Sequence, residues 1–386
     1  MFLIAAAARG LLLLLSMLGV AATFLPVWRT DAWWVRYLDY PRLQVTALML
    51  AVLLLLIVPS LRWRGQAWVG WAAAAGLALA VGWNAWLLSP YLEPLMSEAQ
   101  LATPAPAGNC GAANRLRVLV ANVQMTNRHD HRLLQIVRQA DPDVAWFQET
   151  DAWWEEELSP LGAAMPHGVA EAQANYFGIH LFSKLPLQDA RVRHLTGSRN
   201  PSVFASVTLP VGGVVKLYAM HPRPPQVEQS TAERDGQLMA AALAAHGDAE
   251  PHVLFGDLNS VPWDGVIGRL SQIGRFLDPR VGRGLFITWN ANDTVAKWPL
   301  DHILPGPGLQ VASLRVLPAF GSDHHPLLAE LCLVPRQEGD AALPSADAAD
   351  LQAAREAVRR GQGEAAGPGA ADPPGSGDGR GNEQGD

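Results

Sequence analysis

The sequence of 386 residues has few cysteines and lacks the short motifs that mark several common kinds of active site. Its 2 cysteines lie far apart, which argues against a zinc site built from clustered thiolates. The chain contains no glycine-rich phosphate loop of the Walker type and no serine nucleophile elbow. Any chemistry must therefore rest on other side chains.

The chain also lacks an excess of positive charge. Its 29 Lys and Arg residues are outnumbered by 36 Asp and Glu residues, for a net charge of -7. By region, residues 1–113 carry +2, residues 114–336 carry −3 and residues 337–386 carry −6. Domains that hold long polyanions usually show a clear basic excess, so a high-affinity nucleic-acid binder is disfavoured. A small phosphate substrate remains compatible with this balance.

Long apolar stretches are abundant in the first quarter of the chain. They cover about residues 10–28, 43–61 and 66–88, and each has roughly the 17–25 residues that a membrane-spanning helix needs. The first stretch would also suit a signal peptide, but two further stretches follow it and no Ala-x-Ala-like cleavage site is evident. We expect three transmembrane helices, with tryptophans near their ends as interfacial anchors.

Their orientation is not fixed by charge. With the N-terminus inside, three arginines face the cytoplasm and three face outward, which is nearly a tie. Three spans place the two chain ends on opposite sides of the membrane. The remaining chain is then extracytoplasmic if the N-terminus is inside, and cytoplasmic if it is outside.

Four regions are expected along the chain. Residues 1–92 form the membrane region, 93–114 a Pro/Ala/Gly-rich linker, 115–336 a folded domain, and 337–386 a disordered acidic tail with a possible helix over DLQAAREAVRR. The domain contains eight short apolar strands with a few helices between them. This pattern predicts an α/β sandwich of mixed or antiparallel sheets.

Polar side chains stand at the ends of six of these strands. They are Asn122, Glu149, His221, Asp257 with Asn259, Asp301 with His302, and Asp323 with His324 and His325. Each one alone is better explained as a turn former, a helix cap or a locally packed residue. For example, HVLFGDLNSVPWD reads as a strand, a turn and a helix capped by Asn259 or Ser260. The whole set, which includes no lysine, is harder to explain in this way.

This set suits the hydrolysis of a phosphate ester with the help of a hard divalent cation. Carboxylate and amide oxygens are preferred ligands of Mg²⁺. A bound cation can neutralise charge on phosphoryl and leaving oxygens, while a carboxylate activates water and a histidine held by an aspartate stabilises the transition state.

The order Asn122, QET around Glu149, HPRPP, GDLN, LDHIL and SDHHP resembles the endonuclease/exonuclease/phosphatase superfamily, which has the DNase-I-like fold. The resemblance covers about residues 115–335 and is greatest with a bacterial subgroup that carries an N-terminal membrane region. It implies a four-layer sandwich of two β-sheets flanked by helices. It also implies an integral protein of the bacterial inner membrane.

The resemblance assigns roles to individual residues. Glu149 is the principal ligand for Mg²⁺, or Mn²⁺, with Asn122 and Asp323 nearby. Asp257 activates the attacking water, and Asn259 orients it and binds phosphate. His221 and His324 contact the phosphate, Asp323 also holds His324, and Asp301 supports the site. Tyr176 and His180 remain unassigned, and no inserted loop or basic helix for gripping duplex DNA is evident.

The same resemblance makes the first and last strands of the domain antiparallel neighbours. This would bring Cys110 close to Cys332, although two unrelated cysteines are an alternative. We expect a disulfide, which indicates an oxidising, extracytoplasmic location.

Three functional classes follow. The first is a membrane-anchored phosphoester hydrolase acting on nucleic acid, phospholipid or a small phosphodiester, with no obligate protein partner evident. The second is a silent binding module, which would be expected to lose Glu149, Asp257 or His324. The third is a transporter or channel subunit, for which the spans offer few polar residues: Ser16, Thr23, Thr46 and Asn84.

Overall fold

A computed structural model describes residues 2–57, 67–92, 110–197, 200–335 and 345–366 of the chain. The expected linker therefore lies largely outside the described residues. The N-terminal region contains α1 (Phe2–Phe24), η1 (Leu25–Val27), α2 (Trp33–Arg36), η2 (Tyr37–Asp39), α3 (Arg42–Ile57), α4 (Ala67–Leu88) and η4 (Ser89–Tyr91). The helices that follow are α5 (Asp130–Ala140), α6 (Ala152–Leu158), η7 (Ser159–Ala163), α7 (Ala232–His246), α8 (Gly265–Gly274) and α9 (Ala348–Ala365).

The strands of the domain form two mixed sheets. The first sheet has the order β10-β11-β1-β2-β4-β3, and its strands are β1 (Arg115–Asn122), β2 (Val144–Gln148), β3 (His167–Glu171), β4 (Ile179–Ser183), β10 (Leu309–Val316) and β11 (Leu327–Leu333). The second has the order β5-β6-β7-β8-β9, with β5 (Leu187–Arg193), β6 (Ser202–Thr208), β7 (Val214–Ala219), β8 (His252–Asp257) and β9 (Asp301–Pro305). Only β1–β2 and β7–β8 pair in parallel; the other pairs are antiparallel.

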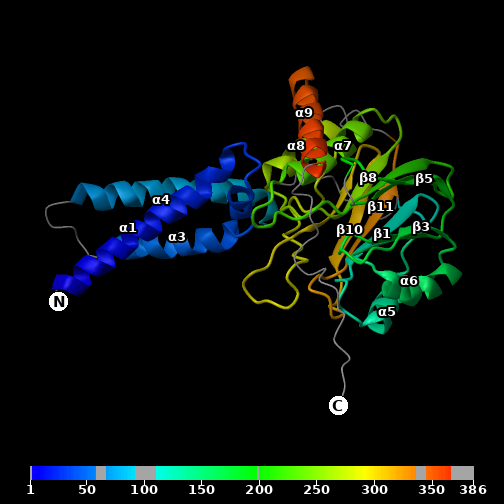
Figure 1. Cartoon of the computed structure of the whole chain (residues 1–386), viewed down its shortest axis with the longest axis horizontal. Coiled ribbons are helices and arrows are strands. Elements are labelled where there is room, and N and C mark those ends of the chain that lie inside the picture. The colour runs from blue at the N-terminus through cyan, green and yellow to red at the C-terminus, as the bar shows by residue number, and fades with distance from the viewer. Residues whose placement is uncertain (1, 58–66, 93–109, 198–199, 336–344, 367–386) are drawn as a thin grey trace, which may run out of the picture.

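The two sheets pack face to face with helices on their outer sides (Figure 1). The central core joins apolar side chains of both sheets, such as Val118, Trp146, Leu217 and Phe255. A second cluster lies beneath α7, α8 and α9, and a third lies beneath α5 and α6. These four layers confirm the expected DNase-I-like sandwich, since each sheet buries apolar side chains on both faces.

All eight expected strands are present, but three further strands were not foreseen. They are β3, β5 and β10, whose burial along the chain is only partial. β3, β5 and β10 are edge strands, so their sequences lack the continuous apolar run of a central strand. The expected helix cap was also placed too early. Asp264, rather than Asn259 or Ser260, caps α8 by accepting a hydrogen bond from the backbone N of Val266.

The expected pairing of β1 with β11 and the disulfide Cys110–Cys332 are both confirmed. β1 and β11 run antiparallel, and Arg115 faces Cys332 across the pair. The Cα atoms of the two bridged cysteines are 5.4 Å apart. The bridge therefore fixes the start of the domain to its last strand.

The N-terminal helices α1, α3 and α4 form a bundle that extends away from the sandwich (Figure 1). The helical segments Ala6–Val27 and Trp68–Tyr91 are long and apolar enough to cross a membrane. α3 is shorter and qualifies only together with the preceding Trp33–Asp39 segment, from which it bends by 73°. The expected second stretch, 43–61, continues into residues outside the described part. The bundle therefore provides two, or up to three, candidate spans.

Three of the four polar residues of these spans, Thr23, Thr46 and Asn84, gather at the end of the bundle near the sandwich, while Ser16 Oγ donates to the carbonyl O of Leu12 within α1. Arg42 donates to Asn84 Oδ1 at 2.8 Å, and its guanidinium also pairs with Asp39 at 2.8 Å. Asn84 Nδ2 in turn donates to Thr46 Oγ1 at 2.9 Å and to Thr23 Oγ1 at 3.4 Å. These contacts tie the three helices to the segment between α1 and α3. A structural network of this kind explains the polar residues without a transport path.

The acidic tail contains α9, which is longer than the segment where a helix was considered. It packs on α7 at a glycine crossing, where Gly361 and Gly236 approach closely. A Cβ added to Gly361 would lie 2.8 Å from the carbonyl O of Ala232, closer than real contacts. Part of the tail therefore belongs to the folded domain, and residues 367–386 lie outside the described part.

Candidate active site

The strand ends singled out in the sequence converge on one cleft of about 410 Å³. Its polar lining includes Glu149, His221, Asp257, Asn259, Asp323 and His324. The parallel pairs β1–β2 and β7–β8 lie inside their sheets, and their carboxyl ends meet at the same edge of the sandwich. This topology brings together groups separated by up to two hundred residues of sequence.

Asn122 connects the two sheets at the floor of the cleft. Its Nδ2 donates to Glu149 Oε1 at 2.8 Å and to Asp257 Oδ2 at 3.2 Å. Glu149 follows β2 in the left-handed backbone region, with a φ of 61°, which turns its side chain toward the cleft. Loss of water around the partly buried carboxyl raises the pKa of Glu149 to about 7.

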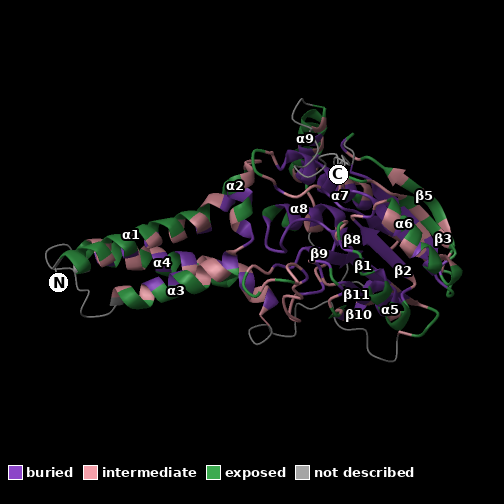
Figure 2. Cartoon of the chain, turned by 60° about the horizontal axis from the view of Figure 1, so that its bottom comes forward, coloured by how far each residue is buried: buried purple, intermediate pink, exposed green. Residues whose placement is uncertain are grey.

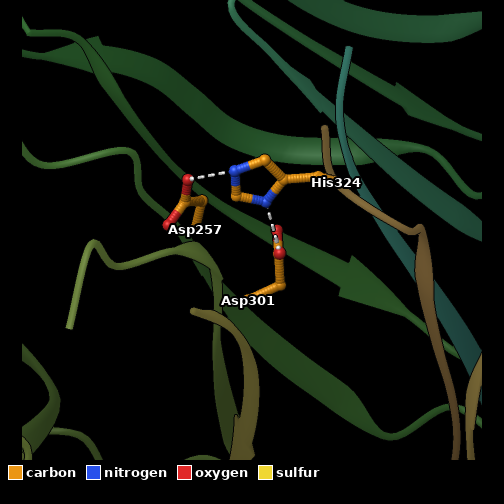
Figure 3. A group of neighbouring side chains, drawn as sticks. All are labelled: Asp257, Asp301 and His324. Atoms are coloured by element: carbon orange, nitrogen blue, oxygen red, sulfur yellow. Dashed lines mark hydrogen bonds and ion pairs between the residues drawn. The ribbon is translucent and has the colours of Figure 1, made fainter. Parts of the chain in front are cut away.

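His324 lies between two buried aspartates (Figure 3). Its Nδ1 is 2.8 Å from Asp301 Oδ2, and its Nε2 is 3.5 Å from Asp257 Oδ2. Burial opposes the charged ring, but the two carboxylates outweigh it and raise the pKa of His324 to about 10. Burial also raises the pKa of Asp257. The two carboxylates therefore favour the protonated form of His324, and Asp301 orients its ring.

Asp323 does not hold His324, contrary to expectation. Its Oδ2 accepts a hydrogen bond from Trp289 Nε1 at 2.9 Å. Its backbone N donates to Gln124 Oε1 at 3.1 Å, which fixes the loop before β11. Asp301 is the partner of His324 because it starts β9 and is paired in register with Asp257 of β8.

His221 and Asn259 lie on the β7 and β8 side of the cleft. His221 Nε2 is 4.0 Å from Asp257 Oδ2, and burial lowers the pKa of His221 to about 3. Asn259 has a φ of 49°, and its Nδ2 donates to the carbonyl O of Pro222 at 3.0 Å. Its backbone N donates to Asp257 Oδ1 at 2.9 Å. The GDLN turn thus positions both the carboxylate and the amide.

Two groups of residues in or beside this cleft could bind a metal cation. Asp257, Asp301 and His324 are close enough together to hold a metal ion. However, both ring nitrogens of the protonated His324 already face carboxylates, so the imidazolium itself occupies the position of a cation. Glu149 accepts hydrogen bonds from two uncharged donors, Asn122 Nδ2 at 2.8 Å and the backbone N of Met125 at 3.4 Å. Glu149, with Asn122 and Asp323 nearby, fits a hard divalent cation better.

The sequence analysis gave no role to several residues in and beside the cleft. Gln148 Oε1 accepts from the backbone N of Asp257 at 2.8 Å and so links β2 to β8. Six aromatic residues line the cleft: Tyr37, Tyr40, Tyr176, Phe177, Trp289 and Trp298. The sequence signal for Gln148 was the presence of a polar residue inside an otherwise apolar strand. Tyr37 and Tyr40 gave no signal, because they belong to the membrane region.

Three other histidines lie outside this lining. His302 Nε2 is 2.8 Å from the carbonyl O of Ser260, and His325 Nδ1 is 3.1 Å from that of Leu317. Both therefore pack locally, as expected. His180 Nδ1 is 2.9 Å from Thr150 Oγ1, and burial lowers the pKa of His180 to about 4.

Comparisons with known proteins agree with this architecture. Residues 119–324, more than half of the chain, match the model of the "Endonuclease/Exonuclease/phosphatase family". No curated protein matches the chain. Among solved structures, D. rerio TDP2 complexed with a single-strand DNA product is 15% identical with a TM-score of 0.48, covering 56% of this chain and 98% of that chain.

Two further structures are similar at the same level. The human Nocturnin catalytic domain with bound sulfate is 16% identical with a TM-score of 0.48, covering 57% of this chain and 95% of that chain. An endonuclease/exonuclease/phosphatase from Beutenbergia cavernae DSM 12333 is 19% identical with a TM-score of 0.46, covering 58% of this chain and 72% of that chain. The extent of the family-model match identifies this chain as a member of the endonuclease/exonuclease/phosphatase family, whose members are divalent-metal-dependent phosphoester hydrolases.

Proposed function

We propose that this chain is a membrane-anchored phosphoester hydrolase that requires Mg²⁺ or Mn²⁺. The main support is the convergence of Glu149, Asp257 and His324 on one cleft, with Asn122 bonded to both Glu149 and Asp257 and with Asp301 beside His324. A silent binding module would have no need to hold the carboxyl groups of Glu149 and Asp257 and the ring of His324 together at one cleft.

The metal would be held by Glu149, with Asn122 and Asp323 completing its protein ligands. When bound, such a cation polarises the phosphoryl group and neutralises charge on the leaving oxygen. Asn122 Nδ2 now donates to Glu149 at 2.8 Å, so a cation would take the place of this donor on the carboxylate. The remaining steps fall to the protein's own residues.

Asp257 orients the attacking water and accepts its proton. Its carboxylate is held by the backbone N of Asn259 and by Asn122 Nδ2, and both bonds fix its direction toward the cleft. His324 donates a hydrogen bond from Nε2–H to a phosphoryl oxygen and so stabilises the charge that develops there. Asp301 keeps the ring charged and oriented through the 2.8 Å contact with Nδ1. His221 and Asn259 bind the phosphate from the opposite side.

The N-terminal helices anchor the enzyme, and the catalytic domain faces an extracytoplasmic space. Large apolar side chains are exposed on the bundle, as lipid contact requires; Leu14, Leu54 and Leu79 are 48%, 67% and 70% exposed. The Cys110–Cys332 disulfide supports an oxidising location for the domain. Labelling of thiols in intact cells should succeed only after reduction; two thiols reactive without reductant would contradict the external location.

A hydrolysis assay on the purified full chain tests the activity. The probes are bis(p-nitrophenyl) phosphate, an oligonucleotide and phospholipid vesicles, each with Mg²⁺, with Mn²⁺ and with EDTA. Asp257→Asn should lower kcat by about 10³-fold on any hydrolysed probe, since a positioned base contributes about 10²–10⁴. Asp189→Asn is the matched control, because Asp189 is exposed and its positive φ of 50° is tolerated by asparagine. Unchanged activity in Asp257→Asn, or metal-dependent hydrolysis of no probe, would refute the proposal.

A further inference from the structure

The membrane region supplies one wall of the catalytic cleft. Tyr37 of η2 and Tyr40, the residue that follows η2, line the same cavity as Glu149, Asp257 and His324. We propose that the substrate is an amphiphilic phosphoester, a membrane lipid whose phosphate enters the cleft while its acyl chains stay in the bilayer. This inference rests on the hydrolase activity proposed above and names its substrate class.

The segment that carries Tyr37 and Tyr40, which forms this wall, is held against the domain by several contacts. The Tyr40 hydroxyl donates to the backbone carbonyl of Asn259, and the Tyr40 ring meets Trp298 edge-on at 5.6 Å between centroids. Trp263 Nε1 donates to the carbonyl O of Asp39 at 2.7 Å. Arg36 forms a buried ion pair with Asp264, the residue that caps α8. The segment between α1 and α3 is therefore held in place on several sides.

The end of α4 is buried against the same part of the domain. Leu88 and Tyr91 share an apolar cluster with Tyr40, Val261, Trp263, Trp298 and Leu300. Tyr91 meets the ring of Trp263 edge-on at 5.8 Å between centroids. Figure 2 shows the bundle ending directly at the sandwich, with α2 at the junction. The cleft is therefore fixed relative to the ends of the apolar helices.

Exposed tryptophans mark where the membrane surface lies. Trp68 and Trp71 are 72% and 74% exposed near the start of α4, and Trp86 is 64% exposed near its end. Residues Trp68 and Trp86 are about 27 Å apart at 1.5 Å per residue, close to the thickness of the hydrocarbon core. Trp28, which is 71% exposed, follows the span Ala6–Val27 at the same end as Trp86.

The cleft wall begins next to this surface. Tyr40 precedes Arg42, the first residue of α3, by two positions. Tyr37 is 43% exposed and stacks on Tyr40 at 5.2 Å between ring centroids. A continuous row of aromatic rings then leads inward, since Trp298 stacks on Trp289 at 4.8 Å and Trp289 donates to Asp323. The route from the bilayer surface to the catalytic carboxylates is therefore amphipathic.

The lining of the cleft matches a single phosphate on an apolar body. Its polar groups include Glu149, Asp257 and His324, and four of its six aromatic residues form the row that starts at Tyr37 and Tyr40 and continues through Trp298 to Trp289. Within the described part of the chain, no lysine or arginine lines the cavity. A nucleic-acid strand would present further phosphates that need such partners, whereas one lipid phosphate does not.

The test uses the full chain in lipid nanodiscs with Mg²⁺. Phosphatidic acid, phosphatidylglycerol and phosphatidylethanolamine in the bilayer are compared with their deacylated, water-soluble counterparts and with a single-stranded oligonucleotide. We expect kcat/KM for at least one bilayer lipid to exceed that of its deacylated counterpart and that of the oligonucleotide by about tenfold or more, equivalent to roughly 1.4 kcal/mol.

The variant Tyr37→Ala tests whether this aromatic wall contributes to hydrolysis of the lipid. It should lower kcat/KM for the lipid by about tenfold, as expected for loss of an aromatic contact, and should reduce the lipid-to-soluble ratio. Trp71→Ala, an exposed aromatic residue at the far end of α4, is the matched control and should leave both rates unchanged.

The outcomes separate the two proposals. Hydrolysis of a soluble ester or oligonucleotide at a rate equal to or above that of every lipid overturns the lipid inference and leaves the hydrolase activity standing. A lipid rate unaffected by Tyr37→Ala also overturns the inference. Absence of metal-dependent hydrolysis of all probes refutes the hydrolase proposal itself.

Discussion

The hydroxyl of Tyr40 donates a hydrogen bond to the backbone carbonyl of Asn259. Tyr40 belongs to the N-terminal helical region, and Asn259 belongs to the GDLN turn that carries Asp257. The two regions read as separate in the sequence, yet this contact joins them at the catalytic cleft. The N-terminal region therefore supplies part of the lining of the candidate cleft.

Metal addition should stabilise the protein. A ligand that binds only the folded state adds about 2.7 kcal/mol to the free energy of unfolding at one hundred times its Kd. Saturating Mg²⁺ should therefore raise Tm measurably, and EDTA should reverse this shift. Glu149→Gln should abolish the shift, because the amide carries no charge. Glu156→Gln on the exposed face of α6 is the control and should keep the full shift. Thermal unfolding in detergent, followed by tryptophan fluorescence, measures Tm in each case. An undiminished Tm shift in Glu149→Gln would show that the metal binds at other residues.

Asp301→Asn should impair both stability and turnover. The substitution removes the buried carboxylate 2.8 Å from His324 Nδ1 and leaves the imidazolium with a weaker partner. Breaking a buried ion pair costs about 3–5 kcal/mol, so a clear loss in the free energy of unfolding is expected. The pKa of His324, raised to about 10 in the parent protein, should fall, and an NMR titration of the ring should detect this. Normal stability with an unchanged His324 pKa would contradict the assigned pairing.

His180 should make the protein acid-sensitive. Its folded pKa, lowered to about 4 by burial, lies below the value of about 6.5 in an unfolded chain. The unfolded state therefore binds more protons between these values, and stability is lost as the pH falls from about 6.5 to 4. Replacement by glutamine removes the titrating group and should flatten this part of the stability profile.

The size of this effect follows from the shift. About 2.5 pKa units correspond to at most about 3 kcal/mol, at 1.36 kcal/mol per unit. Chemical denaturation at pH 7 and at pH 4.5 measures the difference for both proteins. An equal loss of stability in both proteins on acidification would rule out His180 as the cause.

Gly361→Leu should release α9 from the domain. A Cβ at this position would meet the carbonyl O of Ala232 at 2.8 Å, and overpacking of this kind costs about 1–3 kcal/mol. Gly363→Leu on the same helix is the matched control, because nothing lies within 4 Å of its added Cβ. Limited proteolysis should cleave the tail of Gly361→Leu faster than that of the control. Equal cleavage rates would show that the glycine crossing does not hold α9.

Much of the fold follows from local sequence patterns. The central strands are continuous apolar runs, and their ends carry polar residues, because a strand buried on both faces leaves its polar groups only at its ends. For the same reason the candidate residues Asn122, Glu149 and Asp257 could be named in advance, and the structure brings them within hydrogen-bonding distance of one another. The edge strands β3 and β5 could not, since partial burial gives them no continuous apolar pattern.

The sequence by itself determined the residue types that the cleft contains and the helices apolar enough to cross a membrane. Only the tertiary structure decided which aspartate pairs with His324, because the pairing of β9 with β8 is what brings Asp301 rather than Asp323 to its Nδ1. It also decided that Tyr37 and Tyr40 reach the cleft. Contacts between residues more than two hundred positions apart depend on how the sheets and helices pack, and no local pattern encodes them.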